Sequence, residues 1–322
     1  MRIIFLGTPE FAADCLDALI HSKHEIVAVV TQPDKPSDRG GKIQFSEVKK
    51  YALEKGIPLF QFLKISRDGL IDLKALNPDI MVTAAYGQIL SQAVLDIPKY
   101  GVINVHASLL PKYRGASPIQ TAIMRGDTET GVTIMKTDIG LDTGDIISKI
   151  STPIAENETT GDLSKKLAML GSSLLIDTID KIENGTASYT KQDQLDATVT
   201  SKISKTDCLI NWEKSTKEIK CLIHAANPNP IARTELDGQV VKVLRAKAVE
   251  FELSDESKNL QVGTVLSESS PKRGLFVKTG DGAIELVEIQ LAGGKAMPAK
   301  VVLNGRKIKA YDQLKTITQV YN

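Results

Sequence analysis

The feature that most constrains this chain is an alternation of short apolar segments with amphipathic ones across its first 185 residues. Apolar runs typical of buried strands occupy 2–7, 25–32, 79–87, 101–108, 130–138 and 145–154. Helical periodicity marks 9–22, 45–56, 91–97, 117–127 and 160–185. Buried strands that alternate with helices are typical of a parallel sheet covered on both faces. We therefore predict an α/β, Rossmann-like first domain with a mostly parallel sheet.

The amino-acid composition changes after Gly185. The stretch that follows is polar and rich in Ser and Thr, which indicates a linker. A helical pattern at 215–226 comes next, and then short strand patterns joined by the hairpin turns LDGQ and GDGA. This spacing favours a small, OB-like β-barrel. The predicted organisation is a first domain over 1–186, a linker over 187–204 and a C-terminal β-barrel domain over 205–322.

Composition indicates the class of protein and the cellular compartment. Of its 322 residues 42% are hydrophobic and 25% are charged, and the net charge is +1, as in an ordinary globular protein. From Lys205 onward 18 Lys and Arg face 14 Asp and Glu, a basic balance that fits a phosphate-bearing partner and chance variation about equally well. The three cysteines form no CxxC pair, which favours a reducing cytoplasm and disfavours a zinc site. We expect a cytoplasmic monomer without a metal and, lacking a run of about 18 apolar residues, without a membrane span.

Three short motifs superficially match known sites but fail on spacing or context. A dinucleotide-binding turn needs three glycines, and after the first strand only Gly7 is present. Gly41-Lys42 lacks both the preceding glycine and the following Ser or Thr of a phosphate-binding loop. The Asp142-Thr143-Gly144 triplet of aspartic proteases is not repeated, although those enzymes need two carboxylates. These patterns disfavour a nicotinamide dehydrogenase, a P-loop enzyme and an aspartic protease.

A more promising pair lies in the strand segment 101–108. Asn104 and His106 are two residues apart, so their side chains point to the same side, at the carboxyl end where parallel sheets carry ligand sites. An amide N–H can stabilise an oxyanion, and an imidazole can move a proton near neutral pH. Asp142, in the glycine-flanked loop DIGLDTGD, is a natural partner to orient the imidazole. From spacing alone a structural histidine is the commoner case, so both interpretations stay open at this point.

Longer stretches around these residues resemble one family. NVHASLLPKYRGASPIQ and GVTIMKTDIGLDTGDII together resemble the folate-dependent formyltransferases. FLGTPEFA, TQPDKP followed by RGGK, and AYGQIL resemble the members that act on methionyl-tRNA, and the likeness continues in KISKTDCLINW and VKVLRAK. The likeness covers nearly the whole chain, and the paired motifs are highly specific.

The resemblance implies transfer of a formyl group from 10-formyltetrahydrofolate to the α-amine of initiator methionyl-tRNA. It implies that Asn104 donates to the formyl oxygen, that His106 stabilises the tetrahedral intermediate and assists proton transfer, and that Asp142 accepts from His106 and relays a proton. The nucleophile is the substrate's own amine, so no Ser or Cys nucleophile is needed. The positions that match the family's folate contacts are Ser108, Leu109, Leu110, Pro111, Tyr86, Gly87, Gln88, Ile89 and Leu90. Without the resemblance, plain core packing would be the preferred interpretation of the two leucines after Ser108.

The resemblance also implies contacts with tRNA. Arg39 and Lys42 match the loop that reaches the acceptor end of the tRNA. Lys202 and Lys205 would lie near the same strand of the tRNA, and the basic barrel would follow its phosphates. The chain has DRG where the family has G-R-G, and NPNP where it has N-P-W-P.

Two alternatives stay open: a formyltransferase for another amine, such as an amino sugar nucleotide or glycinamide ribonucleotide, and an RNA-binding module with an inactive catalytic domain. TQPDKP and the basic barrel favour tRNA over the first, and the intact Asn-His-Asp set argues against the second.

Overall fold

The computed structural model describes residues 1–36, 43–249 and 251–318. The chain forms two compact units that interleave along the sequence. The first unit comprises 1–118, 130–152 and 164–200. The second comprises 119–129, 153–163 and 201–322.

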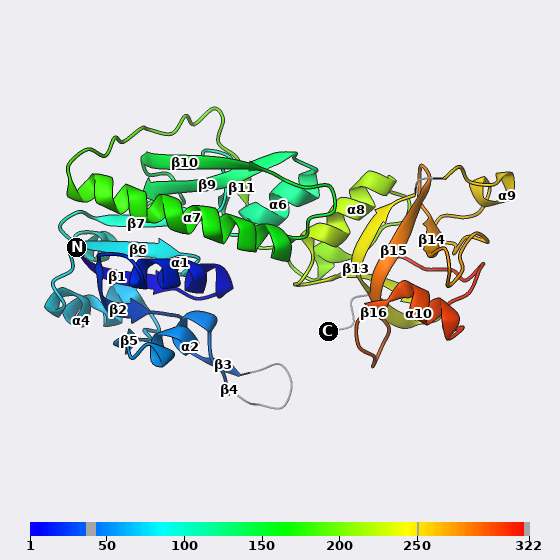
Figure 1. Cartoon of the computed structure of the whole chain (residues 1–322), viewed down its shortest axis with the longest axis horizontal. Coiled ribbons are helices and arrows are strands. Elements are labelled where there is room, and N and C mark those ends of the chain that lie inside the picture. The colour runs from blue at the N-terminus through cyan, green and yellow to red at the C-terminus, as the bar shows by residue number, and fades with distance from the viewer. Residues whose placement is uncertain (37–42, 250, 319–322) are drawn as a thin grey trace. The chain divides into compact units, whose positions relative to one another are not determined.

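A seven-stranded sheet forms the centre of the first unit within the described residues (Figure 1). Its strands are, in spatial order, β10 (Ile146–Pro153), β9 (Glu129–Lys136), β7 (Val102–His106), β6 (Ile80–Ala84), β1 (Arg2–Gly7), β2 (Glu25–Val30) and β5 (Leu59–Phe60). The pairs β1–β2, β1–β6, β2–β5 and β6–β7 are parallel, whereas β7 and β9 are antiparallel. The predicted mostly parallel sheet is confirmed.

The two faces of this sheet are covered by different helices. Ile4 and Leu6 of β1 belong to one apolar cluster with side chains of three short helices, α3 (Ile65–Asp68), α4 (Leu70–Ala75) and α5 (Gln92–Leu95). Because side chains alternate along a strand, the residues between them face the other side. The strands are therefore buried on both faces, which explains why their sequences are continuously apolar.

The opposite face carries α1 (Glu10–Ile20) and the long helix α7 (Thr160–Glu183), which run beside each other (Figure 1). Gly171 lets α7 come close to the sheet, since a Cβ atom there would lie 3.2 Å from the Cγ1 atoms of both Val105 and Val132. The helices predicted over 9–22 and 160–185 are confirmed.

The remaining short elements flank this core. Helix α2 follows the N-cap Ser46, whose hydroxyl accepts from the Lys49 amide. The elements of the first unit are α2 (Glu47–Glu54), β3 (Lys35–Pro36), β4 (Ile43–Gln44), β8 (Arg114–Gly115) and β11 (Val199–Thr200). Helix α6 (Pro118–Arg125) belongs, apart from Pro118, to the second unit.

The second unit is built on an antiparallel sheet. Its strands are, in spatial order, β12 (Ala232–Leu236), β13 (Gln239–Ala248), β15 (Ala283–Gln290) and β14 (Leu275–Lys278), with β16 (Met297–Pro298) also paired to β15. The predicted LDGQ turn joins β12 to β13 through Asp237 and Gly238, whose φ angles are +48° and +76°. Single bridges connect β12 back to β14 and close a ring of paired segments: Glu235 with Lys315, Thr264 with Gln313, and Val265 with Val277.

Helices and a buried tryptophan complete the second unit. Helix α8 starts with a capping box, in which Ser215 and Glu218 each bond the other's backbone. The indole of Trp212 is buried and donates to Thr234 Oγ1 at 3.0 Å. The helices are η1 (Thr206–Cys208), α8 (Thr216–Ala225), α9 (Asp255–Lys258) and α10 (Ala299–Asn304).

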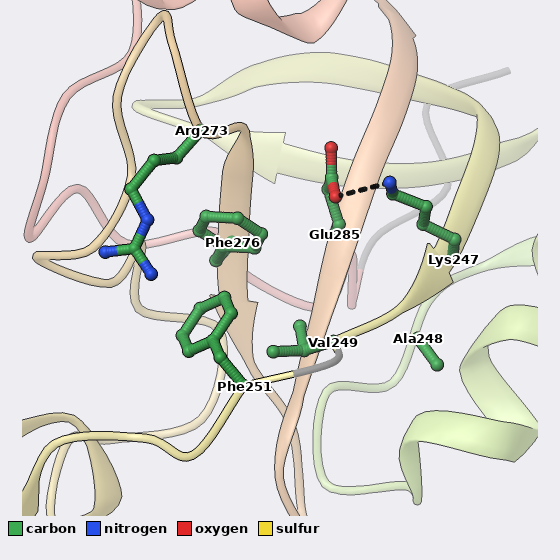
Figure 2. A pocket seen from close by; sticks show the side chains of 7 residues that line it. All are labelled: Lys247, Ala248, Val249, Phe251, Arg273, Phe276 and Glu285. Atoms are coloured by element: carbon green, nitrogen blue, oxygen red, sulfur yellow. Dashed lines mark ion pairs between the residues drawn. The ribbon is translucent and has the colours of Figure 1, made fainter.

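A cavity of about 230 Å³ lies in the second unit (Figure 2). Lys247 Nζ is 3.2 Å from Glu285 Oε2, and the guanidinium of Arg273 lies over the ring of Phe251 at 4.7 Å. The rings of Phe251 and Phe276 meet edge to face at 4.9 Å. The charged and aromatic groups of this cavity therefore already contact one another.

The segment that we predict to be a linker, 187–204, makes specific contacts in the first unit. Its strand β11 pairs in parallel with β8, and Gln192 and Thr200 are buried. Among the described residues, none of the helices combines the length and the apolar character needed to cross a membrane.

Candidate active site

Asn104 is the central residue of β7, directly opposite Thr83 of the neighbouring strand β6. Thr83 Oγ1 donates to Asn104 Oδ1 at 2.9 Å. Because the amide oxygen faces this hydroxyl, the amide nitrogen must point the other way. It lies 3.5 Å from Asp142 Oδ1, at the long limit of a hydrogen bond. Thr83 therefore fixes the direction in which Asn104 presents its N–H groups.

His106 ends β7 on the same face and is 5% exposed. Its Nε2 lies 2.9 Å from the carbonyl oxygen of Tyr113. A carbonyl only accepts, so Nε2 is the donor in this contact. The other nitrogen, Nδ1, faces Asp142 Oδ2 at 3.6 Å. Both ring nitrogens therefore face oxygen acceptors, an arrangement that suits an imidazole which gains a proton during a reaction.

Asp142 lies in the loop between β9 and β10, as the sequence predicts. Its side chain is 18% exposed. The Gly115 amide donates to Asp142 Oδ2 at 2.7 Å, which leaves Oδ1 toward Asn104. The backbone of Asp142 has a φ of +51°, in the left-handed region that residues other than glycine enter at a cost. The structure thus brings Asn104, His106 and Asp142 together, with one carboxylate facing both other side chains.

The arrangement suits acyl transfer to an amine. Amide and imidazole N–H groups can stabilise an oxyanion, and a carboxylate beside an imidazole can take up and pass on a proton. The 3.5 Å separation from Asp142 Oδ1 exceeds the usual 2.7–3.2 Å of a hydrogen bond, so the N–H groups of Asn104 are still available to a ligand. His106 Nε2 already donates to the Tyr113 carbonyl, and its Nδ1 is the nitrogen left to take up a proton.

Two family models match the sequence. One, described as formyl transferase, covers residues 1–179, and the other, described as formyl transferase, C-terminal domain, covers residues 202–307. The chain belongs to the formyl transferase family. A methionyl-tRNA formyltransferase from Agathobacter rectalis is 47% identical to this formyl transferase over 306 residues, which make up 95% of this chain and 96% of that protein.

Solved structures agree with this formyl transferase in fold. The N-formyltransferase from Helicobacter canadensis, in complex with folinic acid and dTDP-3-aminofucose, gives a TM-score of 0.66 at 22% identity and covers 89% of this chain and 98% of its own. The sugar 3N-formyl transferase WlaRD, solved in the presence of dTDP and 5-N-formyl-THF, gives 0.63 at 23% identity and covers 92% and 99%. At these identities the likeness establishes the fold alone.

The stretch predicted to contact folate after β7 differs in exposure from residue to residue. Ser108 and Leu110 have no accessible surface, and Leu110 packs with Met135 and Ile146. The Ser108 hydroxyl donates to the Lys112 carbonyl at 2.6 Å and closes the turn. Leu109 and Pro111 are half-buried, so these two offer surface to a ligand.

The second predicted folate segment leaves β6, the neighbour of β7, at the same end of the sheet. Gln88 is engaged inside the protein, since its amide accepts from the Ile65 amide at 2.9 Å and donates to the Phe62 carbonyl at 2.9 Å. Ile89 is 84% exposed. Gly87 is exposed with a φ of +86°, and Leu90 is buried.

Tyr86, the first residue of that segment, stands out chemically. It is 4% exposed, and its hydroxyl has no hydrogen-bond partner among the described residues. Burial raises the pKa of Tyr86 to about 12. Its carbonyl accepts from Thr8 and Gln32 at 3.1 and 3.0 Å, which anchors the start of the segment. Folate contact by either segment stays a prediction.

Two of the four predicted tRNA contacts lie within the described residues. Lys202 and Lys205 are exposed residues of the second unit. Arg39 and Lys42 lie outside the described residues.

One group of metal-capable side chains occurs in the described chain, and it has other partners. His24, Asp180 and Glu183 place ligand atoms within 4.8 Å of one another. Lys23 Nζ lies 2.9 Å from Asp180, and the Met1 ammonium lies 3.2 Å from both His24 and Glu183. These cations already neutralise the carboxylates.

The sequence did not reveal the residues that orient the side chains of Asn104, His106 and Asp142. Thr83 carries a detectable signal, because it is a hydroxyl at the end of an otherwise apolar strand, as His106 is an imidazole there. Gly115 carries a weaker signal, as the glycine of a turn. Arg114 and Gln192, which support the Asp142 loop, carry no local signal.

Proposed function

We propose that this formyl transferase moves the formyl group of 10-formyltetrahydrofolate onto the α-amine of methionyl-tRNA, giving the formylated initiator used in translation. The carrying observation is the 47% identity to a methionyl-tRNA formyltransferase across 95% of this chain and 96% of that protein. This match spans both units of the chain.

The reaction balances without an outside reagent. The amine nitrogen forms a bond to the formyl carbon, whose oxygen takes the negative charge of a tetrahedral intermediate. The bond from that carbon to the folate nitrogen then breaks, and the nitrogen leaves with the electron pair and takes a proton. The amine loses one proton, so the site must remove one proton and supply one.

We assign these tasks to the clustered side chains. Asn104 donates to the formyl oxygen as charge develops, from an amide that Thr83 holds in the donating direction. His106 stabilises the same charge and takes part in proton transfer. Asp142 accepts from His106 and relays the proton of the amine. An α-amine titrates at roughly 7.7–8.0, so a modest base at neutral pH is sufficient.

For the donor we propose a site beside the ends of β6 and β7. Leu109 and Pro111 are its accessible members in the first segment, and exposed Gly87 and Ile89 are those in the second. Apolar surface of this kind suits the flat faces of a pterin. The proposed site uses no metal.

For the acceptor we propose that Arg39, Lys42, Lys202 and Lys205 bind tRNA phosphates, which would make affinity fall as salt rises. The proposed setting is the cytoplasm, with the protein as a monomer. We also propose 1–186, 187–204 and 205–322 as catalytic domain, linker and tRNA-binding domain, with the linker packed on the first of them.

The test is a formylation assay with 10-formyltetrahydrofolate and charged initiator tRNA. Elongator methionyl-tRNA and an amino sugar nucleotide serve as competing acceptors. We expect formyl-methionine on the initiator tRNA and little product on the competitors. Preferred formylation of the sugar, or no formyl-methionine at all, would contradict the proposal.

A further inference from the structure

The turn Tyr113-Arg114-Gly115 contains a buried cation without a carboxylate partner. Arg114 is 5% exposed, and no carboxylate of the described residues forms an ion pair with it. Its guanidinium donates through Nε and Nη2 to Gln192 Oε1, at 3.0 and 2.9 Å, and through Nη1 to Gln194 Oε1, at 2.9 Å. A buried guanidinium is costly unless its donors are used, so these contacts need an explanation.

Gln192 links Arg114 to the loop that carries Asp142. With its oxygen held by Arg114, its amide nitrogen faces the loop and donates to the carbonyls of Asp142 and Gly144, both at 2.8 Å. An amide has two N–H donors, so both are used. Gln192 is 7% exposed and thus shielded from water that would compete for these bonds. Arg114 therefore sets the direction of the Gln192 amide, and that amide grips the loop at two points.

The conformation of the Asp142 loop requires support from such hydrogen bonds. The left-handed backbone of Asp142, at a φ of +51°, is a conformation that an aspartate does not favour by itself. Ile139 and Leu141 just before it are 73% and 55% exposed, so apolar packing does not hold that side of the loop. The two carbonyl contacts from Gln192 are polar anchors that fix the peptide planes around the carboxylate.

The turn around Arg114 touches the same site from both sides. The Tyr113 carbonyl accepts from His106 Nε2, and the Gly115 amide donates to Asp142 Oδ2. The turn is itself tied to the segment that carries Gln192, since the Tyr113 amide donates to Thr198 Oγ1 at 2.8 Å. The turn 113–115 and Gln192 together therefore contact the side chains of His106 and Asp142 and the backbone of the Asp142 loop.

We propose that Arg114 and Gln192 are positioning residues, which act through the carbonyls of Asp142 and Gly144 to hold the Asp142 carboxylate against His106 and Asn104. The proposal rests on the role proposed for Asp142 in formyl transfer. Neither residue touches the reacting atoms. The competing explanation is that the pair only stabilises the fold.

The decisive variants are Gln192→Glu and Gln192→Met. Glutamate keeps an acceptor for Arg114, and a stronger one because it is charged, but loses both donors to the loop. Methionine removes the donors without adding a charge near Asp142. Gln194→Glu is the matched control, because it makes the same change on the exposed partner of Arg114, which forms no hydrogen bond with the Asp142 loop in the described part of the chain.

We expect both Gln192 variants to lower kcat by about 10- to 100-fold with KM changed less than about threefold, and to shift the pH profile of kcat. Gln194→Glu should keep kcat and KM within about threefold of the wild type and should leave the pH profile of kcat unchanged. The folded fraction of each variant is measured by circular dichroism. A kcat of Gln192→Glu or Gln192→Met within about threefold of the wild type, or a loss that only follows the folded fraction with an unchanged pH profile, would overturn the proposal. An inactive wild type in the same assay would instead contradict the proposed function.

Discussion

Two buried histidines, His106 and His224, occupy similar local environments in different units. His106 is 5% exposed and His224 is 3% exposed. Each directs Nε2 at a backbone carbonyl, that of Tyr113 at 2.9 Å and that of Ala246 at 2.8 Å. The difference is at the other nitrogen, since His106 Nδ1 faces a carboxylate at 3.6 Å, whereas no carboxylate of the described chain forms an ion pair with His224.

The comparison separates a structural histidine, His224, from the one that we propose to be reactive, His106. Burial lowers the pKa of His224, and the nearby Lys220 and Arg245 lower it further, against the bond to the Ala246 carbonyl and the charge of Asp162. These effects favour the neutral form of the His224 imidazole, whose Nε2–H donates to the Ala246 carbonyl. A histidine that faces a carboxylate can instead take up a proton without leaving a buried charge unpaired. Burial and a backbone bond are therefore shared features, and the carboxylate is the distinguishing one.

The largest expected effect breaks the comparison directly. In His106→Gln the amide replaces the Nε2 donor but not the nitrogen that faces Asp142, so we expect kcat for formyl transfer to fall by on the order of 10³-fold. The identical change His224→Gln, matched in burial and backbone bond, should leave kcat within about threefold. Both are measured in the formylation assay on protein checked for folding. Equal losses in the two variants would show that His106 is as structural as His224.

Much of the fold could be predicted because its signals are local. The strands β1, β2, β6 and β7 are largely apolar runs, and the hairpin at Gly238 follows from its turn residues. The contacts of the predicted linker could not be predicted, because Gln192 and Thr200 are polar residues in a polar stretch. Their burial depends on partners at Arg114 and Gly115, far away in the sequence.

The candidate site divides in the same way. Asn104 and His106 follow from the two-residue period of a strand, and the flanking glycines point to Asp142. The groups that aim these side chains come from other segments, Thr83 from a neighbouring strand and Gln192 from the stretch after α7. A sequence states which residue is chemically capable, but the direction of its donors is set by contacts that only the folded chain creates.

The next largest effect concerns the amide that holds Asp142. Gly115 has a φ of +104°, and a Cβ atom there would collide with the Thr200 carbonyl oxygen. We expect Gly115→Ala to lower the free energy of unfolding by roughly 2–4 kcal/mol and to reduce kcat as well. Gly185→Ala is the control, because Gly185 has a φ of +69° with nothing within 4 Å of its Cβ position. It should cost about 1–2 kcal/mol, from backbone strain alone. Urea unfolding of both variants checks this, and equal losses would mean that close packing on β11 contributes nothing.

A smaller effect sharpens the structural side of the comparison. His224→Ala leaves the buried Ala246 carbonyl without its donor and opens a gap beside α8. The free energy of unfolding should fall by about 2 kcal/mol, with kcat per folded molecule changed less than about threefold. His224→Gln, which keeps a donor, should lose less than His224→Ala. A large loss of kcat in folded His224→Ala would contradict the purely structural role.

The smallest expected effect is a pH dependence of stability that belongs to His224. Its folded pKa is lowered from the ordinary value of 6.5, so below that value the unfolded chain binds a proton that the folded chain does not. The contribution of His224 is therefore complete above 6.5 and is lost as pH falls through 6.5 toward the lowered folded pKa. The loss for one proton is at most about 1.4 kcal/mol per pH unit. The pKa of His24 is lowered as well, chiefly by burial, so the wild type keeps a slope from that residue. The difference between the wild type and His224→Gln isolates His224, and it should shrink on acidification in urea unfolding curves at a series of pH values. A gap that stays constant or widens as pH falls would mean that the folded protein protonates His224 as readily as the unfolded chain does, which would contradict the lowered pKa.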